Sequence, residues 1–191
     1  MQSMRPTPEA AMRRVNLEHE RGFTLIEMMI AFTILAILVT VSAPSIRDMV
    51  LNGRLTSQAT ELMADLALAR SEASRRGVRV AICKNATGGT ANTACSTTSA
   101  WTDGWLIFVD TNNDGSLTGG ETLLRVHQAL PAGSVLTATP TANFVQARPS
   151  GNITPAGTVF KMCDTRTGNV GRSVTIAATG RASMSTNVAC P

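Results

Sequence analysis

The sequence is poor in aromatic and charged residues. Aromatic side chains make up 4% of the 191 residues, tyrosine is absent, and charged residues make up 16%. Hydrophobic residues reach 43%, which excludes a disordered chain and predicts a core built from aliphatic side chains. The formal net charge of +4 is too small to indicate a nucleic-acid partner by itself.

The residue types that carry most enzyme chemistry are also scarce. The chain has two histidines, of which His19 precedes the apolar segment and His127 stands alone in a predicted strand. No nucleophile-elbow sequence, phosphate-binding P-loop or zinc-ligand spacing is present. We therefore predict that the protein has no enzymatic activity.

The cysteines lack the C-x-x-C spacing of zinc sites and redox pairs. An even number of them in a loop-rich region is typical of disulfides formed in an oxidising compartment. Three pairings are open, and four reduced, buried thiols in the cytoplasm are the alternative. We favour Cys83–Cys95, which closes a short loop, and Cys163–Cys190, which ties down the C-terminus.

One long segment, residues 28–46, carries no charge at all. Together with residues 23–27 it gives 24 residues, roughly 36 Å of helix, which exceeds the bilayer core of about 30 Å. Arginines precede this segment, so the positive-inside rule places the N-terminus in the cytoplasm. In a bacterium the anchor would lie in the inner membrane and the remainder in the periplasm, an oxidising compartment. The preceding arginines are Arg5, Arg13, Arg14 and Arg21.

Glu27 is a single carboxylate near the start of this apolar stretch. An unpaired charge near the bilayer core costs roughly 3 kcal/mol or more, so such a residue indicates a function. Cleavage after Gly22 would create a partner for it, the new α-amino group of Phe23. An uncleaved single-span anchor is the alternative.

Residues 21–27, RGFTLIE, resemble the class III prepilin signal, which prepilin peptidase cuts between glycine and phenylalanine. The resemblance implies cleavage between Gly22 and Phe23 and N-methylation of Phe23. It also implies that Glu27 guides docking of the subunit into a filament. Methylation keeps the positive charge of the amine, so pairing with Glu27 remains part of the prediction.

Two further features bear on this resemblance. The leader is long if Met1 is the true start, whereas a start at Met12 gives a basic leader of 11 residues. Pro44 predicts a kink in the helix, because proline removes one backbone hydrogen bond. Pilin-like helices often carry a proline near this position, and a proline at a membrane boundary is the alternative.

Residues 45–77 have the pattern of an amphipathic helix that packs on a sheet. Arg75, Arg76 and Gly77 predict its end, since cations and glycine both favour a helix C-terminus. This helix and the apolar segment would form one long helix, bent at Pro44. Apolar residues recur at steps of three and four, namely Leu55, Ala59, Leu62, Leu66, Ala69 and Ala73.

Short strands separated by turns follow this helix. The chain is therefore predicted to be α+β, with a leader (1–22), a transmembrane and filament-core helix (23–44), an amphipathic helix (45–77) and a β-rich globular domain (78–191). The predicted strands are 78–83, 105–109, 121–130, 143–148, 159–163 and 173–178.

Residues 104–124, GWLIFVDTNNDGSLTGGETLL, resemble a hairpin of the GspH/FimT family of pseudopilins and minor pilins. The resemblance implies a type IV pilin-like fold, with the long helix packed on the β-rich domain. It also implies assembly with other pilins or pseudopilins, after processing by prepilin peptidase. GspH belongs to type II secretion pseudopili and FimT and FimU to type IV pili, and both filaments stay open here.

The same hairpin matches the pattern of an EF-hand calcium loop. Oxygen ligands at Asp110, Asn112, Asp114 and Glu121 would hold Ca²⁺. A strand, however, leads into the loop where an EF-hand has a helix. We favour the alternative, a β-turn in which Asn and Asp bond their own backbone and Gly115 adopts a positive φ.

Some FimT-like minor pilins bind DNA through a C-terminal Gly-Arg-x-Arg motif. Here the matching residues are 180–183, in which Arg181 keeps the first arginine and Ser183 replaces the second. Each lost phosphate contact weakens DNA binding, and Arg166 and Arg172 are the candidates to compensate. A pilus-associated DNA receptor is therefore the second functional hypothesis, and solvated surface charges are its alternative.

Overall fold

The structure is a computed structural model that describes residues 22–86 and 94–191. The predicted leader, apart from Gly22, and the choice between Met1 and Met12 lie outside the described residues, as does part of the loop after Cys83. The chain divides into two compact units, Met1–Pro44 and Ser45–Pro191.

Helix α1 (Leu25–Arg76) runs for 52 residues and contains Pro44 in its interior. Within the described part of the chain, α1 is long and apolar enough to cross a membrane. Its most apolar window of 18 residues has a mean hydropathy of 2.3, and none of these residues is buried. The predicted kink at Pro44 stays a prediction. The apolar stripe predicted in its second half is confirmed, because each member is at most 1% exposed: Leu55, Ala59, Leu62, Leu66, Ala69 and Ala73.

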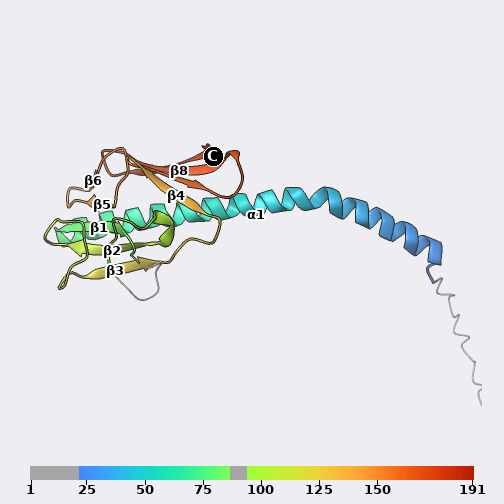
Figure 1. The fold of residues 1–191 in the computed structure, drawn as a ribbon, viewed down its shortest axis with the longest axis horizontal. Coiled ribbons are helices and arrows are strands. Elements are labelled where there is room, and N and C mark those ends of the chain that lie inside the picture. Colours follow the sequence, from blue (N-terminus) through green and yellow to red (C-terminus); the bar gives the residue numbers. More distant parts are fainter. Residues whose placement is uncertain (1–21, 87–93) are drawn as a thin grey trace, which may run out of the picture. The chain divides into compact units, whose positions relative to one another are not determined.

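Two antiparallel sheets lie along the second half of α1 (Figure 1). The five-stranded sheet has the order β3-β2-β1-β5-β6, and the four-stranded sheet has the order β4-β7-β8-β9. A short 3₁₀ helix, η1 (Trp101–Asp103), precedes β2. The strands are β1 (Arg79–Lys84), β2 (Trp105–Asp110), β3 (Leu123–His127), β4 (Val135–Thr139), β5 (Phe144–Ala147), β6 (Ile153–Thr154), β7 (Val159–Cys163), β8 (Gly168–Ile176) and β9 (Ala182–Cys190).

The main core joins the apolar stripe of α1 to one face of each sheet. Its largest fully buried side chains include Trp105 of β2 and Phe160 of β7. Trp101 packs edge-on against Phe160, with ring centroids 5.0 Å apart. A second cluster covers the other face of the five-stranded sheet, around Leu106 and Phe108. The helix therefore contributes the central layer of the core.

Three strands were not predicted from the sequence, and the strand predicted over 121–130 was too long. β9 was missed because it is an edge strand whose side chains are mostly exposed, so no apolar alternation marks it. β6 has two residues, and in β4 only Leu136 is fully buried. β3 runs from Leu123 to His127 and is therefore shorter than predicted at both ends.

Two disulfides are present, and they are the two pairs favoured from the sequence. Cys83–Cys95 joins β1 to the loop before η1, and Cys163–Cys190 joins the end of β7 to the end of β9. Their Cα atoms lie 5.6 Å and 5.8 Å apart, which is ordinary disulfide spacing. The Ser45–Pro191 unit is therefore tied at two separate places.

Candidate functional site

The predicted cleavage junction leads directly into the start of α1. Phe23 is 77% exposed and Gly22 is exposed as well. Thr24 Oγ1 accepts a hydrogen bond from the Glu27 backbone N–H at 3.3 Å, and Glu27 Oε2 faces the Thr24 backbone N–H at 3.5 Å. This reciprocal arrangement is a capping box, which fixes where the helix begins. Glu27 therefore caps the helix in the uncleaved chain, and its pairing with the amine of a cleaved Phe23 stays a prediction.

The apolar half of α1 exposes its large side chains all around the helix. An apolar surface of this size must be covered by lipid or by other protein chains, because its exposure to water is energetically unfavourable. The side chains at least half exposed include Leu25, Ile26, Met29, Ile30, Phe32, Ile34, Leu35, Ile37, Leu38, Val39 and Val41.

The hairpin loop of the predicted calcium site uses its oxygen atoms to hold its own backbone. Asp110, 1% exposed, accepts backbone hydrogen bonds from Asn113 at 2.7 Å and Gly115 at 3.1 Å. Glu121 accepts from the backbone N–H groups of Thr111 at 2.8 Å and Thr118 at 3.0 Å. The loop is thus built as the turn that the sequence favoured.

The remaining ligands of the calcium hypothesis follow the same pattern. Asn112 Oδ1 accepts from the Asp114 backbone at 3.1 Å, and Asp114 Oδ1 accepts from Ser116 at 2.7 Å. Across residues 22–86 and 94–191, no group of three or more His, Cys, Asp or Glu side chains is placed to hold a metal ion. The prediction that the protein binds no cofactor therefore stays untested, and calcium binding by this loop is the disfavoured alternative, which a calorimetric titration with calcium would test.

Two of the three arginines of the DNA hypothesis are engaged within the protein. Arg166 forms an ion pair with Asp164 at 2.7 Å and with Asp48 of α1 at 3.2 Å. Arg172 is 9% exposed and donates to Thr56 Oγ1 of α1 at 3.2 Å and to two backbone carbonyls. These side chains hold the four-stranded sheet on the helix and do not gather with Arg181.

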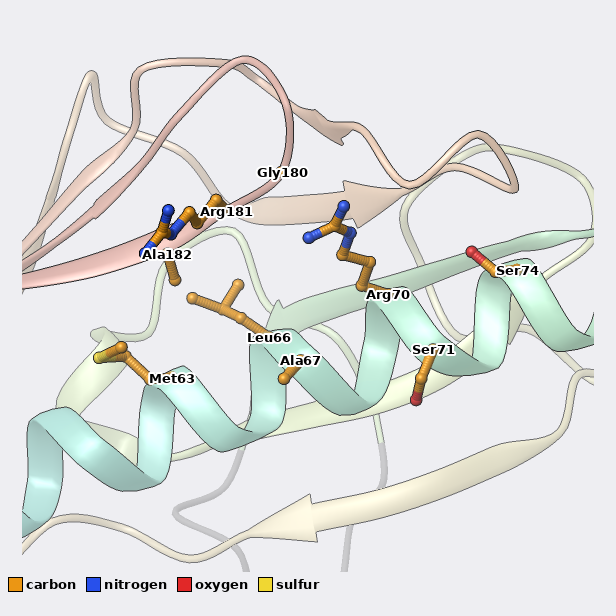
Figure 2. Close-up of a pocket in the computed structure, with 9 residues that line it drawn as sticks. All are labelled: Met63, Leu66, Ala67, Arg70, Ser71, Ser74, Gly180, Arg181 and Ala182. Atoms are coloured by element: carbon orange, nitrogen blue, oxygen red, sulfur yellow. The ribbon is translucent and has the colours of Figure 1, made fainter.

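Arg181 is exposed and lies on a groove between α1 and the β8–β9 turn (Figure 2). The groove has a volume of about 460 Å³, and Arg70 extends from α1 toward the same turn. Leu66 and Met63 form its apolar floor. Within the described ranges, neither arginine forms an ion pair. Arg70 therefore adds a second positive charge to the groove that Arg181 lines, and the local motif did not reveal it.

A buried polar cluster also joins α1 to the five-stranded sheet. Asp65 is fully buried, accepts a hydrogen bond from Trp105 Nε1 at 2.8 Å and lies 3.0 Å from Arg125 Nη1. His127 stacks on Trp105, with centroids 3.8 Å apart, and its Nε2 lies 3.2 Å from Glu61 Oε2. His127 is half-buried and lies in β3.

Burial raises the pKa of the Asp65 carboxyl above its usual value, although the Trp105 hydrogen bond and the Arg125 charge oppose this effect. The sequence analysis did not single out this cluster, because Asp65 is charged and stands outside the recurring apolar positions of the helix. The one signal was its spacing, three residues after Leu62 and four before Ala69, which places Asp65 on the face of the apolar stripe.

Comparison with known proteins extends these observations. The sequence model of the family described as type II transport protein GspH matches residues 58–180. The prokaryotic N-terminal methylation motif matches residues 19–43, which include the predicted cleavage junction. No curated protein sequence matches the chain.

Solved structures share the fold. The type IV minor pilin FimU of Pseudomonas aeruginosa aligns with a TM-score of 0.58 at 23% identity, over 73% of this chain and 93% of that one. The minor pseudopilin EpsH from the type II secretion system of Vibrio cholerae aligns with a TM-score of 0.51 at 12% identity, over 72% and 99% of the chains. These likenesses establish the type IV pilin-like fold predicted from the sequence. Because the family match spans more than half of its residues, this chain belongs to the type II transport protein GspH family.

Proposed function

We propose that this protein is a minor pilin or pseudopilin, which prepilin peptidase cleaves between Gly22 and Phe23. It then joins other pilins or pseudopilins in a type IV pilus or a type II secretion pseudopilus. The observation that carries this proposal is the N-terminal methylation motif, which leads directly into an exposed apolar helix in a chain of the GspH family. The role is structural, and we expect no catalysis.

The charge distribution supports an orientation in the bacterial inner membrane. Arginines cluster before the apolar segment, so the N-terminus stays in the cytoplasm until cleavage. The β-rich domain then lies in the periplasm, where its two disulfides form. The exposed apolar half of α1 moves from lipid into the filament without meeting water.

The mass of the mature N-terminus tests the cleavage step. We expect the protein from its own cells to begin at a methylated Phe23, and we expect Gly22→Val to keep the leader, because a branched side chain crowds the scissile bond. Glu27→Gln serves as the matched control, since it leaves the junction unchanged but removes the charge that pairs with the amine. It should be cleaved normally and fail to enter the filament. An intact leader on the unmodified protein would contradict the proposal.

DNA binding is the second candidate, and Arg181 with Arg70 on one groove is the observation that favours it. Arg181→Ala should then lose DNA binding in a mobility-shift assay at low salt, where phosphate contacts are strongest. Arg148→Ala is the matched control, because Arg148 is also exposed but lies outside this groove. Equal binding by the two variants would contradict a specific role for Arg181.

A further inference from the structure

Lys84 is the last residue of β1, and it occupies a core position. Side chains alternate along a strand, so Lys84 lies on the same face as Val80 and Ile82, which belong to the main core. Only 7% of Lys84 is exposed. A lysine is almost never buried to this extent unless its charge is paired. The sequence therefore places a cation where the strand pattern calls for an aliphatic side chain.

Within the described part of the chain, the Lys84 ammonium group has a hydrogen-bond acceptor but no opposite charge. Lys84 Nζ donates to the backbone carbonyl of Thr97 at 3.1 Å. No carboxylate in residues 22–86 and 94–191 forms an ion pair with it. Residues 87–93, TGGTANT, contain no Asp or Glu that could do so. An ammonium group has three N–H donors, so this one can still donate to a bound anion.

Lys84 lines a pocket of about 220 Å³, together with residues of η1, β4 and the segment after β4. Trp101 and Leu136 give the pocket an apolar wall, and both belong to the main core. Thr137 and Thr141 also line it and are exposed, so the pocket reaches the surface of the protein. Its volume equals that of roughly seven water molecules. The pocket therefore suits a small molecule.

No carboxylate competes for Lys84 among the described residues of this pocket, because none of those that line it is Asp or Glu. Asp103, at the end of η1, is held by the backbone of its own turn, since its Oδ2 accepts from the Ala100 N–H at 3.0 Å. A ligand with a negative charge would thus meet Lys84 without repulsion from the lining. A hydrocarbon part of the same ligand would be buried on the apolar wall.

We propose that this pocket binds a small aliphatic carboxylate, whose oxygens accept from Lys84 Nζ and whose short chain packs on Trp101 and Leu136. Inorganic phosphate fits less well, because it has no hydrocarbon part to cover the apolar wall. The pocket shares no residue with the groove that Arg181 lines, so this site is separate from the DNA hypothesis. It goes beyond the proposed function, and neither depends on the other.

The two tryptophans of the chain allow binding to be observed directly. Trp101 lines the pocket and donates its indole N–H to the Ala142 carbonyl at 2.9 Å. Trp105 lies outside the pocket and donates to Asp65. An NMR titration of the isotope-labelled, full-length protein in detergent therefore follows one indole signal inside the pocket and one outside it. Hexanoate should shift the Trp101 signal until it saturates and leave the Trp105 signal in place.

Hexanamide and inorganic phosphate are the ligand controls. Hexanamide keeps the chain of hexanoate but lacks the charge, whereas phosphate keeps a charge and lacks the chain. Neither should shift the Trp101 signal at concentrations where hexanoate saturates it. An equal shift with either control would overturn the proposal on the unmodified protein, so this part of the test does not depend on the folding of any variant.

Lys84→Met removes the charge and keeps the length of the side chain. It should weaken hexanoate binding about tenfold or more, the typical effect of losing a hydrogen bond to a charged group. Lys161→Met is the matched control, because Lys161 also donates to a backbone carbonyl, that of Ala189 at 3.2 Å, but lies outside the pocket. The proposal is overturned if hexanoate leaves the Trp101 signal unshifted, shifts both indole signals alike, or binds both variants equally well.

Discussion

At the scale of single residues, Asp65 shows how a polar group is kept inside an aliphatic core. The chain is poor in aromatic residues, and Trp105 is one of only two tryptophans. Its indole N–H points at Asp65 across the interface between α1 and β2. Such a hydrogen bond fixes how the helix is rotated about its own axis relative to the sheet. The Leu and Ala side chains at neighbouring positions could pack on the sheet in several orientations.

Asp65→Asn should change how the stability of the protein depends on pH. Burial raises the pKa of Asp65 in the folded chain, so the folded state holds the proton more tightly than the unfolded state. The stability from this group is present below the usual value of 3.8 and is lost as pH rises through the raised pKa. Asparagine still accepts from Trp105 and has no such dependence.

The measurement is the difference in unfolding free energy between Asp65→Asn and the unmodified protein in detergent, from pH 3 to pH 7. We expect the difference to shift in favour of the variant as pH rises. A difference that stays constant over this range would show that Asp65 does not titrate differently in the folded state.

Residue roles were only partly predictable from the sequence. Arg181, the residue that keeps the first arginine of the DNA-binding motif, is exposed. Arg166 and Arg172 were grouped with it by charge alone, yet their partners Asp48 and Thr56 lie more than 100 positions away in the chain. No local pattern encodes such a contact, because only the packing of the sheet on the helix brings these groups together.

At the scale of elements, β9 is an edge strand that buries few of its own side chains. It lies at the edge of its sheet, most of its side chains are exposed, and residues 182–190 carry no charge. Edge strands of this kind detach or pair with other chains unless they are held. The disulfide between Cys163 and Cys190 holds the last residue of β9 on β7.

Replacing both Cys163 and Cys190 by alanine should therefore lower the unfolding free energy by about 3 kcal/mol, the typical value for one disulfide. The loss of stability should first affect β9, because β9 is the edge strand that the disulfide holds on the sheet. Hydrogen exchange of the β9 amides should accelerate before that of β1 and β2. Uniform acceleration across both sheets would contradict this order.

Helices and strands could be predicted from the sequence where their buried side chains form a clear apolar pattern. α1 was predicted through residue 77 and ends at Arg76, since its buried stripe has helical spacing. β2 and β7 were found because apolar runs mark buried strands. β9 has no such apolar pattern, because most of its side chains are exposed. The pairing register between strands that are distant in the sequence could not be predicted from any local pattern.

At the scale of the whole molecule, three carboxylates in residues 22–86 and 94–191 bind protons less readily in the folded state. Hydrogen bonds from Arg75 and Arg76 lower the pKa of Glu72 to about 2. The Arg166 hydrogen bond lowers the pKa of Asp164. Burial alone would raise the pKa of Glu121, but backbone hydrogen bonds, led by that from Thr118, lower it.

These groups should make the folded protein sensitive to acid in a salt-dependent way. Groups with lowered pKa values stabilise the fold above their usual values of 3.8 and 4.5, and this stability is lost as pH falls through the lowered pKa of each group, which for Glu72 is about 2. Asp65 acts in the opposite direction, so the expected result is a net loss of stability below about pH 4.5.

Raising the ionic strength should separate the loss of stability in acid into a part that depends on salt and a part that does not. Glu72 owes its lowered pKa to hydrogen bonds from charged arginines, whose attraction 1 M salt largely screens, whereas Glu121 owes its lowered pKa to hydrogen bonds from neutral backbone N–H groups, which salt leaves largely intact. Acid unfolding in 1 M salt should therefore retain the part that Glu121→Gln removes and lose the part that Glu72→Gln removes. If 1 M salt changes the effects of both variants by the same amount, the lowered pKa values of Glu72 and Glu121 do not differ in their sensitivity to salt.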